Sequence, residues 1–169
     1  MRASSSWWFG EEPLQPGAPS LWRLILRWAL DRASHVEFTW PARRAAPATL
    51  HPFAAALERQ VTSRWRYAAP IPLRGRVTYG RYRLTPELQA WLLRPSSLYA
   101  WMDDRPEDPA LYRGPQLLVW TISHEGYVSA RLPPNEAARV RDLGFALEPC
   151  PECPEVLYPE VGTPPHDSA

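Results

Sequence analysis

Proline constrains the fold of this chain more than any other residue type. The chain has 169 residues, and 21 of them are prolines. Each proline fixes one backbone angle and removes one hydrogen-bond donor, so proline is tolerated at the first turn of a helix but not inside a helix or a central strand. Pro70 and Pro72 therefore end the helix expected from Pro52, and Pro95 ends the helix expected from Pro86.

The two ends of the chain differ in composition from its middle. Residues 1–19 contain three prolines and two glycines, which predicts an irregular arm whose cluster Trp7-Trp8-Phe9 is apolar enough to dock on the domain or on another molecule. Residues 149–169 are rich in proline and acid, which predicts a disordered acidic tail. Residues 20–148 form the expected single globular domain, long enough to bury a core without metal or disulfide.

Apolar residues at helical spacing predict about four helices in this domain. Ser20 is a suitable N-cap for a largely buried helix, and Pro52 and Pro86 stand at favoured first helical positions. In the second helix, Leu57, Val61 and Trp65 continue a stripe at i, i+4 spacing. The four predicted helices span residues 21–33, 52–66, 86–94 and 134–143.

Alternating apolar and polar residues predict strands at residues 36–40 and 75–84 and a hairpin at 116–132. In the hairpin, the even residues are apolar on both sides of the turn, which requires a loop of odd length. A loop of His124, Glu125 and Gly126 meets this requirement, and it pairs Ile122 with Val128 and Trp120 with Ala130. Helices and strands follow without a regular βαβ rhythm, so the expected fold class is α+β with a mainly antiparallel sheet.

The chain contains no lysine, because all 19 of its cationic residues are arginine. This composition fits the codon bias of a GC-rich, bacterial genome. It excludes a Walker A loop, a pyridoxal phosphate Schiff base and a lysine nucleophile, each of which requires a lysine. No glycine-rich phosphate loop or G-x-S-x-G sequence is present either, so we expect no cofactor.

Charge is distributed unevenly along the chain, although the formal net charge is only +1. Residues 59–100 hold eight arginines and one acid, whereas residues 101–169 hold five arginines and twelve acids. We expect the two blocks largely to neutralise each other across the fold. The alternative is a nucleic-acid site, in which arginines bind phosphates and tyrosines stack on bases. The candidate binding residues are Arg64, Arg66, Arg74, Arg76, Arg81 and Arg83, with Tyr127 and Arg131 from the hairpin.

A cluster of carboxylates suggests a different chemistry. Asp103, Asp104, Glu107 and Asp108 lie within six residues, and carboxylates grouped in this way can bind Mg²⁺ or Ca²⁺. His124 at the predicted hairpin tip could serve as a general base beside them. The alternative interpretation is structural: Asp108 and Pro109 would begin a short helical turn through Tyr112, and the acids would pair with arginines.

The remaining patterns bear on the surface and the compartment. The polar face of the hairpin, with Thr121, Ser123 and Ser129, is either a recognition surface or the ordinary wet side of a sheet. Cys150 and Cys153 form a lone C-x-x-C among prolines, for which two free thiols are the simplest interpretation. The absence of a long apolar run and of a secretory signal favours a cytoplasmic protein without membrane contact.

These observations lead to three functional hypotheses. The first is a small non-enzymatic interaction protein, such as an accessory, inhibitor or immunity-type module, which binds another macromolecule, in the first instance a protein, through its sheet face and aromatic surface. The excess of tryptophan and arginine, which are typical of binding hot spots, supports it. The second is a nucleic-acid-binding protein that uses residues 64–83. The third is a metal-dependent hydrolase built on Asp103, Asp104, Glu107 and His124. The sequence does not indicate an oligomeric state.

Overall fold

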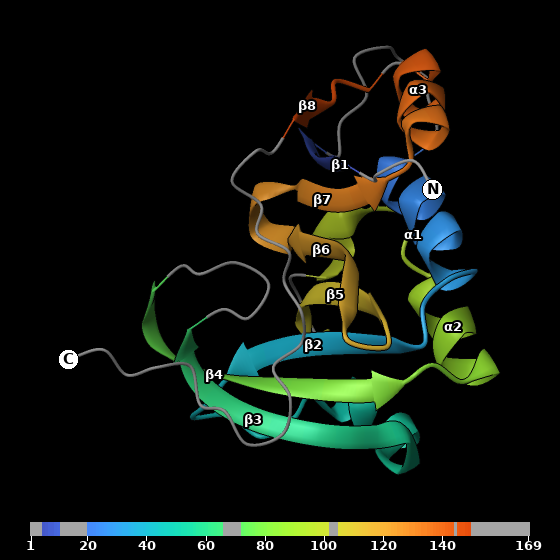
Figure 1. Ribbon diagram of the computed structural model, residues 1–169. Coiled ribbons are helices and arrows are strands. Elements are labelled where there is room, and N and C mark those ends of the chain that lie inside the picture. The colour runs from blue at the N-terminus through green and yellow to red at the C-terminus, as the bar shows by residue number, and fades with distance from the viewer. Residues whose placement is uncertain (1–4, 11–19, 66–71, 102–104, 144, 150–169) are drawn as a thin grey trace.

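The computed structural model describes residues 5–10, 20–65, 72–101, 105–143 and 145–149. One eight-stranded sheet runs through this part of the chain in the order β3-β4-β2-β5-β6-β7-β1-β8, and every neighbouring pair is antiparallel. Figure 1 shows the strands stacked from β8 at the top to β3 at the bottom. The strands are β1 Ser5–Gly10, β2 His35–Pro41, β3 Leu57–Trp65, β4 Pro72–Arg83, β5 Glu107–Arg113, β6 Gln116–Ile122, β7 Tyr127–Leu132 and β8 Glu148–Pro149.

The helices pack beside this sheet and confirm the α+β class expected from the sequence (Figure 1). They are the α-helices α1 Leu21–Leu30, α2 Pro86–Leu92 and α3 Pro134–Asp142 and the 3₁₀ helices η1 Ala48–Ala56, η2 Leu98–Trp101 and η3 Ser123–Glu125. Thr85 caps α2 as expected, because its hydroxyl oxygen accepts a hydrogen bond from the Leu88 N–H at 3.2 Å. None of the helices in the described residues is both long and apolar enough to cross a membrane.

Strand β2 has one apolar side and one polar side. Val36, Phe38 and Trp40 enter the main core together with residues of α1, α2 and α3. The residues between them, His35, Glu37 and Thr39, lie on the opposite face because side chains alternate along a strand. Glu37 and Thr39 are nevertheless buried, so both faces of the central strands are largely withdrawn from water.

The helix predicted from Pro52 is wrong beyond Ala56. Residues 48–56 form the 3₁₀ helix η1, and residues 57–65 form the edge strand β3, which pairs with β4. The spacing that suggested the helix explains the error. Positions i and i+4 lie on one side of a helix, but they also lie on one side of a regular strand, so the spacing does not distinguish the two. In β3 a register shift after Leu57 places Leu57 opposite Tyr82 and Val61 opposite Tyr79, on different faces.

The predicted hairpin forms with a different register. Ile122 pairs with Tyr127 and Trp120 with Ser129, so the loop contains residues 123–126. Gly126 adopts the left-handed conformation that the sequence predicts, with φ +67°. The register prediction failed because it assumed one wet face, whereas β6 is buried on both faces and its apolar residues do not identify the core side.

Burial also removes the polar surface that was considered for this hairpin. Thr121, Ser123 and Ser129 are all buried, so neither of the two interpretations that assumed an exposed polar face applies to them. Thr121 donates a hydrogen bond to the carbonyl oxygen of Pro109 at 3.1 Å. Buried hydroxyls of this kind stabilise the pairing of strands, because a buried polar group needs a partner.

Two segments expected to be irregular or helical are strands. Within the predicted arm, residues 5–10 form β1 between β7 and β8, and Trp7 docks on the core as expected. The turn predicted at Asp108 is part of β5 instead. Asp108 adopts a φ of +49°, which is unusual for a residue other than glycine. Two hydrogen bonds with Ser123 support this conformation. The Ser123 N–H donates to Asp108 Oδ1 at 2.7 Å, and the Asp108 N–H donates to Ser123 Oγ at 3.2 Å.

Two left-handed glycines allow a matched test of this arrangement. A methyl group at Gly126 would overlap the Tyr99 side chain, whereas one at Gly114, with φ +55°, would meet nothing within 4 Å. We expect Gly114→Ala to lower the free energy of unfolding by about 1–2 kcal/mol through backbone strain alone, and Gly126→Ala to lower it further. Chemical denaturation measures both losses. Equal losses would show that Tyr99 does not pack on Gly126.

Candidate functional site

A chain of short hydrogen bonds links Ser34, His35 and Glu58 at one end of the sheet. Ser34 Oγ lies 2.7 Å from Nδ1 of His35, and Nε2 of the same imidazole lies 2.8 Å from Oε2 of Glu58. Ser34 and His35 stand at the start of β2, whereas Glu58 comes from β3. Because β4 lies between these two strands in the sheet, the contact spans a neighbouring strand.

Chemistry fixes the proton positions in this chain of hydrogen bonds. An ionised carboxylate only accepts hydrogen bonds, so a neutral His35 must carry its single proton on Nε2, facing Glu58. Nδ1 is then a bare acceptor, and the Ser34 hydroxyl donates to it at 2.7 Å in preference to the Tyr112 carbonyl oxygen at 3.4 Å. The Ser34 oxygen in turn accepts a hydrogen bond from the N–H of Gly114 at 2.8 Å.

The surroundings of His35 favour its neutral form. Burial lowers the pKa of the imidazole below the ordinary value of 6.5, and the nearby Arg81 guanidinium lowers it further. Glu58 acts in the opposite direction, and Arg83 contributes a small additional lowering of the pKa. The His35 side chain is 17% exposed, so the ring is largely shielded but reachable from solvent.

Arg81 is a buried arginine that stabilises the backbone next to Ser34 and His35. Its side chain is 7% exposed and donates a hydrogen bond to the carbonyl oxygen of Gly114 at 2.6 Å. Its guanidinium also lies over the Tyr112 ring, 5.0 Å from the centroid, and the Tyr112 hydroxyl donates to Glu37 Oε1 at 3.3 Å. Gly114 is therefore held through its carbonyl by Arg81 and through its N–H by Ser34.

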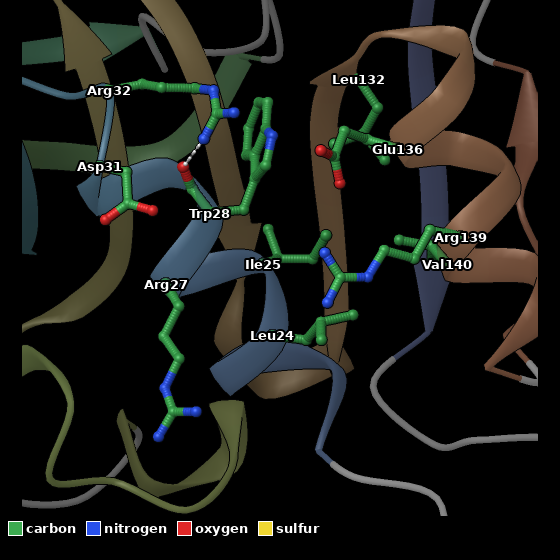
Figure 2. Close-up of a pocket in the computed structure, with 10 residues that line it drawn as sticks. All are labelled: Leu24, Ile25, Arg27, Trp28, Asp31, Arg32, Leu132, Glu136, Arg139 and Val140. Atoms are coloured by element: carbon green, nitrogen blue, oxygen red, sulfur yellow. Dashed lines mark hydrogen bonds between the residues drawn. The ribbon is translucent and has the colours of Figure 1, made fainter.

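A second candidate site is a groove between α1 and α3, with a volume of about 310 Å³ (Figure 2). Its floor is apolar and consists of Ile25, Leu132 and Val140, which are all buried. The half-buried residues Leu24 and Trp28 form the α1 side. A volume of this size accommodates one or two apolar side chains of a ligand.

Charged residues surround the groove, and arginine predominates. Arg27, Arg32 and Arg139 stand on its rim with Asp31 and Glu136. Arg32 lies over the Trp28 ring at 4.9 Å and donates to the Trp28 carbonyl oxygen at 2.8 Å. Arg139 reaches from α3 toward α1 in Figure 2, and its side chain forms no ion pair with a described residue. The rim therefore retains a cation that can bind an anionic group.

The arginines proposed from the sequence do not form one surface. Arg81 is buried, whereas Arg76 and Arg83 are exposed on opposite faces of β4, and neither forms an ion pair with a described residue. Tyr79 and Tyr82, the expected stacking residues of this segment, are buried at 2% exposure. Tyr127 is exposed and Arg131 is half-buried on β7. The side chains of Arg64, Arg66 and Arg74 lie outside the described part of the structure.

The carboxylates proposed as a metal site are only partly described. Asp103 and Asp104, like Cys150 and Cys153, lie outside the described residues. Glu107 and His124 are both exposed, and Nε2 of His124 lies 3.7 Å from Oε1 of Glu125. Among the residues that the structure describes, no three His, Cys, Asp or Glu side chains are grouped so as to hold a metal ion.

The sequence contained only weak signals for the two sites seen here. The Ser34–His35–Glu58 contact depends on the strand order β3-β4-β2, and the residue that completes it lies in a segment predicted to be helical. The groove was partly visible, because Arg27 and Asp31 interrupt an otherwise apolar helix. Its other wall comes from α3, more than a hundred residues later in the chain.

Comparisons with models of protein families, with curated protein sequences and with solved structures give no match for this chain.

The buried and exposed arginines of β4 should differ in their effect on stability. We expect Arg81→Ala to lower the free energy of unfolding by about 2–4 kcal/mol, because it removes a buried hydrogen bond and the packing on Tyr112. Arg83→Ala, two residues along the same face, should change it by less than about 0.5 kcal/mol. Urea denaturation of both variants tests this, and equal effects would contradict the assigned burial.

The pKa of His35 provides a second test. In an NMR titration we expect it to lie below 6.5, to fall further in Glu58→Gln and to rise slightly in Arg83→Gln. Because the folded protein then binds this proton less readily than the unfolded chain, the free energy of unfolding should decrease as the pH falls below about 6.5 and level off below the folded pKa. A His35 pKa above 6.5, or one that is unaffected by Glu58→Gln, would contradict the contacts described.

Proposed function

We propose that this protein is an interaction module whose α1–α3 groove binds an acidic segment of a partner protein. The observation on which this rests is the combination of an apolar floor with a rim of three arginines and two acids. An apolar side chain of the partner would occupy the floor above Ile25 and Val140. A carboxylate beside it would meet Arg139, whose charge has no described ion-pair partner.

Charge decides which kind of occupant is favoured. A basic segment would bring its cations against the arginines, which costs free energy, whereas an acidic segment gains from them. Trp28 adds an aromatic surface at the rim, and Arg32 already lies over that ring. Tryptophan and arginine are the residue types that most often dominate the binding energy of protein interfaces.

A pair of designed peptides tests this proposal. The probe is a fluorescent 12-residue helix rich in glutamate with one central leucine and one phenylalanine, and the control peptide carries lysine in place of every glutamate. We expect the acidic peptide to bind and the lysine peptide not to bind at the same ionic strength, as measured by fluorescence anisotropy. Arg139→Ala should weaken binding about fivefold, which corresponds to roughly 1 kcal/mol.

The control variant is Arg43→Ala, which removes an exposed arginine from the loop after β2, outside the groove lining. It should bind the acidic peptide like the unmodified protein. Equal weakening in both variants would indicate general charge attraction and would overturn the groove as the site. Binding of a labelled single-stranded DNA that is lost in Arg76→Ala/Arg83→Ala, with no peptide binding, would favour the nucleic-acid hypothesis instead.

A further inference from the structure

The Ser34–His35–Glu58 chain of hydrogen bonds has the arrangement of an activated nucleophile. A hydroxyl that donates to an imidazole can lose its proton to it, and a carboxylate on the other ring nitrogen stabilises the imidazolium that forms. Here both contacts are within 2.8 Å. Catalytic triads are recognised by these roles and not by sequence order, so the direct succession of Ser34 and His35 is no obstacle.

We propose that Ser34 is the nucleophile of an acyl-transfer site that acts on small esters, with His35 as general base and Glu58 as the group that orients the imidazole. This inference goes beyond the binding function. Ser34, His35 and Glu58 do not line the groove, so either proposal can fail without the other.

The space and the donors around Ser34 suit such a substrate. Gly114 has no side chain, and a methyl group placed on it would meet nothing within 4 Å, so the space next to its Cα is open. The N–H of Gly114 already points at the Ser34 oxygen from 2.8 Å and is within reach of an oxyanion formed on the carbon bonded to it. Arg81 is a positioning residue, because it holds Gly114 in place through its carbonyl oxygen.

The proposed reaction balances without any further reagent. Ser34 Oγ bonds to the ester carbonyl carbon while its proton passes to Nδ1 of His35. The bond to the alcohol then breaks, and the alcohol leaves with that proton. Water attacks the acyl-serine in the same way, gives one proton through His35 to the departing Ser34 oxygen and releases the carboxylic acid. Exposed Arg83, which pairs with His35 across β2 and β4, favours esters that carry a carboxylate.

The first test is covalent labelling with a fluorophosphonate, followed by mass spectrometry of the intact protein and its peptides. The expected result is one adduct on Ser34, formed with loss of fluoride. The chain has no lysine, so competing amine labelling is limited to its N-terminus. No adduct, or an adduct only on Cys150, Cys153 or another serine, would overturn the proposal.

Hydrolysis of mono-4-nitrophenyl succinate and of 4-nitrophenyl acetate provides the second test. His35→Gln, which keeps the serine and its contact with Gly114, should slow both labelling and hydrolysis at least 100-fold. Glu58→Gln should slow them at least tenfold, and Arg83→Gln should affect the succinate ester more than the acetate. In the unmodified protein the rate should rise with pH as His35 loses its proton. Ser96→Ala, in an exposed loop, is the control for the loss of a serine hydroxyl.

Circular dichroism and thermal unfolding establish that each variant is folded before its rate is compared. A folded His35→Gln protein that is labelled and hydrolyses esters like the unmodified one would show that the hydrogen bonds among Ser34, His35 and Glu58 are purely structural. Peptide binding to the groove should be unchanged in His35→Gln. That result distinguishes failure of the acyl-transfer site from failure of the binding function.

Discussion

The packing of aromatic rings around Phe38 holds the helices on the sheet. Phe38 is stacked on Trp101 at 5.8 Å and meets the edge of Trp91 at the same distance. Trp101 contacts Trp22 of α1 at 6.0 Å and Trp91 of α2 at 5.2 Å, both edge to face. One buried ring of β2 is thus connected to two helices and to η2. Aromatic pairs in these geometries stabilise a core by about 0.5–1.5 kcal/mol each beyond the area they bury.

The same packing positions both candidate sites. Because Phe38 fixes β2 in the middle of the sheet, the residues at the beginning of that strand, Ser34 and His35, have a defined place beside β4 and the β5–β6 turn. Because Trp22 anchors α1, its outer residues form one fixed wall of the groove with α3. Arg105 lies over the rings of Trp91 and Trp101 at 5.0 and 5.3 Å and covers part of this cluster. The sites differ in chemistry, but they depend on one core.

The sequence was sufficient for the parts of the fold that follow from local signals. Thr85 and Pro86 mark the start of α2, and the apolar pattern of residues 21–30 identifies α1. Gly126 marks the left-handed position in the loop between β6 and β7. The errors arose where a local pattern fits two structures. An apolar residue at every fourth position, as at Leu57, Val61 and Trp65, suits a regular strand as well as a helix. Trp120 and Ile122 lie in the second apolar cluster, whereas Val128 and Ala130, their expected partners, lie in the main core.

The sites could not be predicted, because each depends on contacts between distant parts of the chain. His35 meets Glu58 only because β4, which follows both in sequence, inserts between their strands. Arg81 was expected to contact phosphate. It lies instead opposite Glu37 of the neighbouring strand β2, buried next to Tyr112. The lesson concerns burial: charge in the sequence does not show which arginines face solvent.

The most direct test of this account is the tautomer of His35, measured by long-range ¹H–¹⁵N correlation NMR at neutral pH. The account predicts a neutral ring with the proton on Nε2 and a bare Nδ1 that accepts the Ser34 hydroxyl proton. Glu58→Gln should then reduce the preference for this tautomer. A proton on Nδ1 would contradict the account, because Ser34 would then accept a hydrogen bond from the imidazole and could not be activated by it.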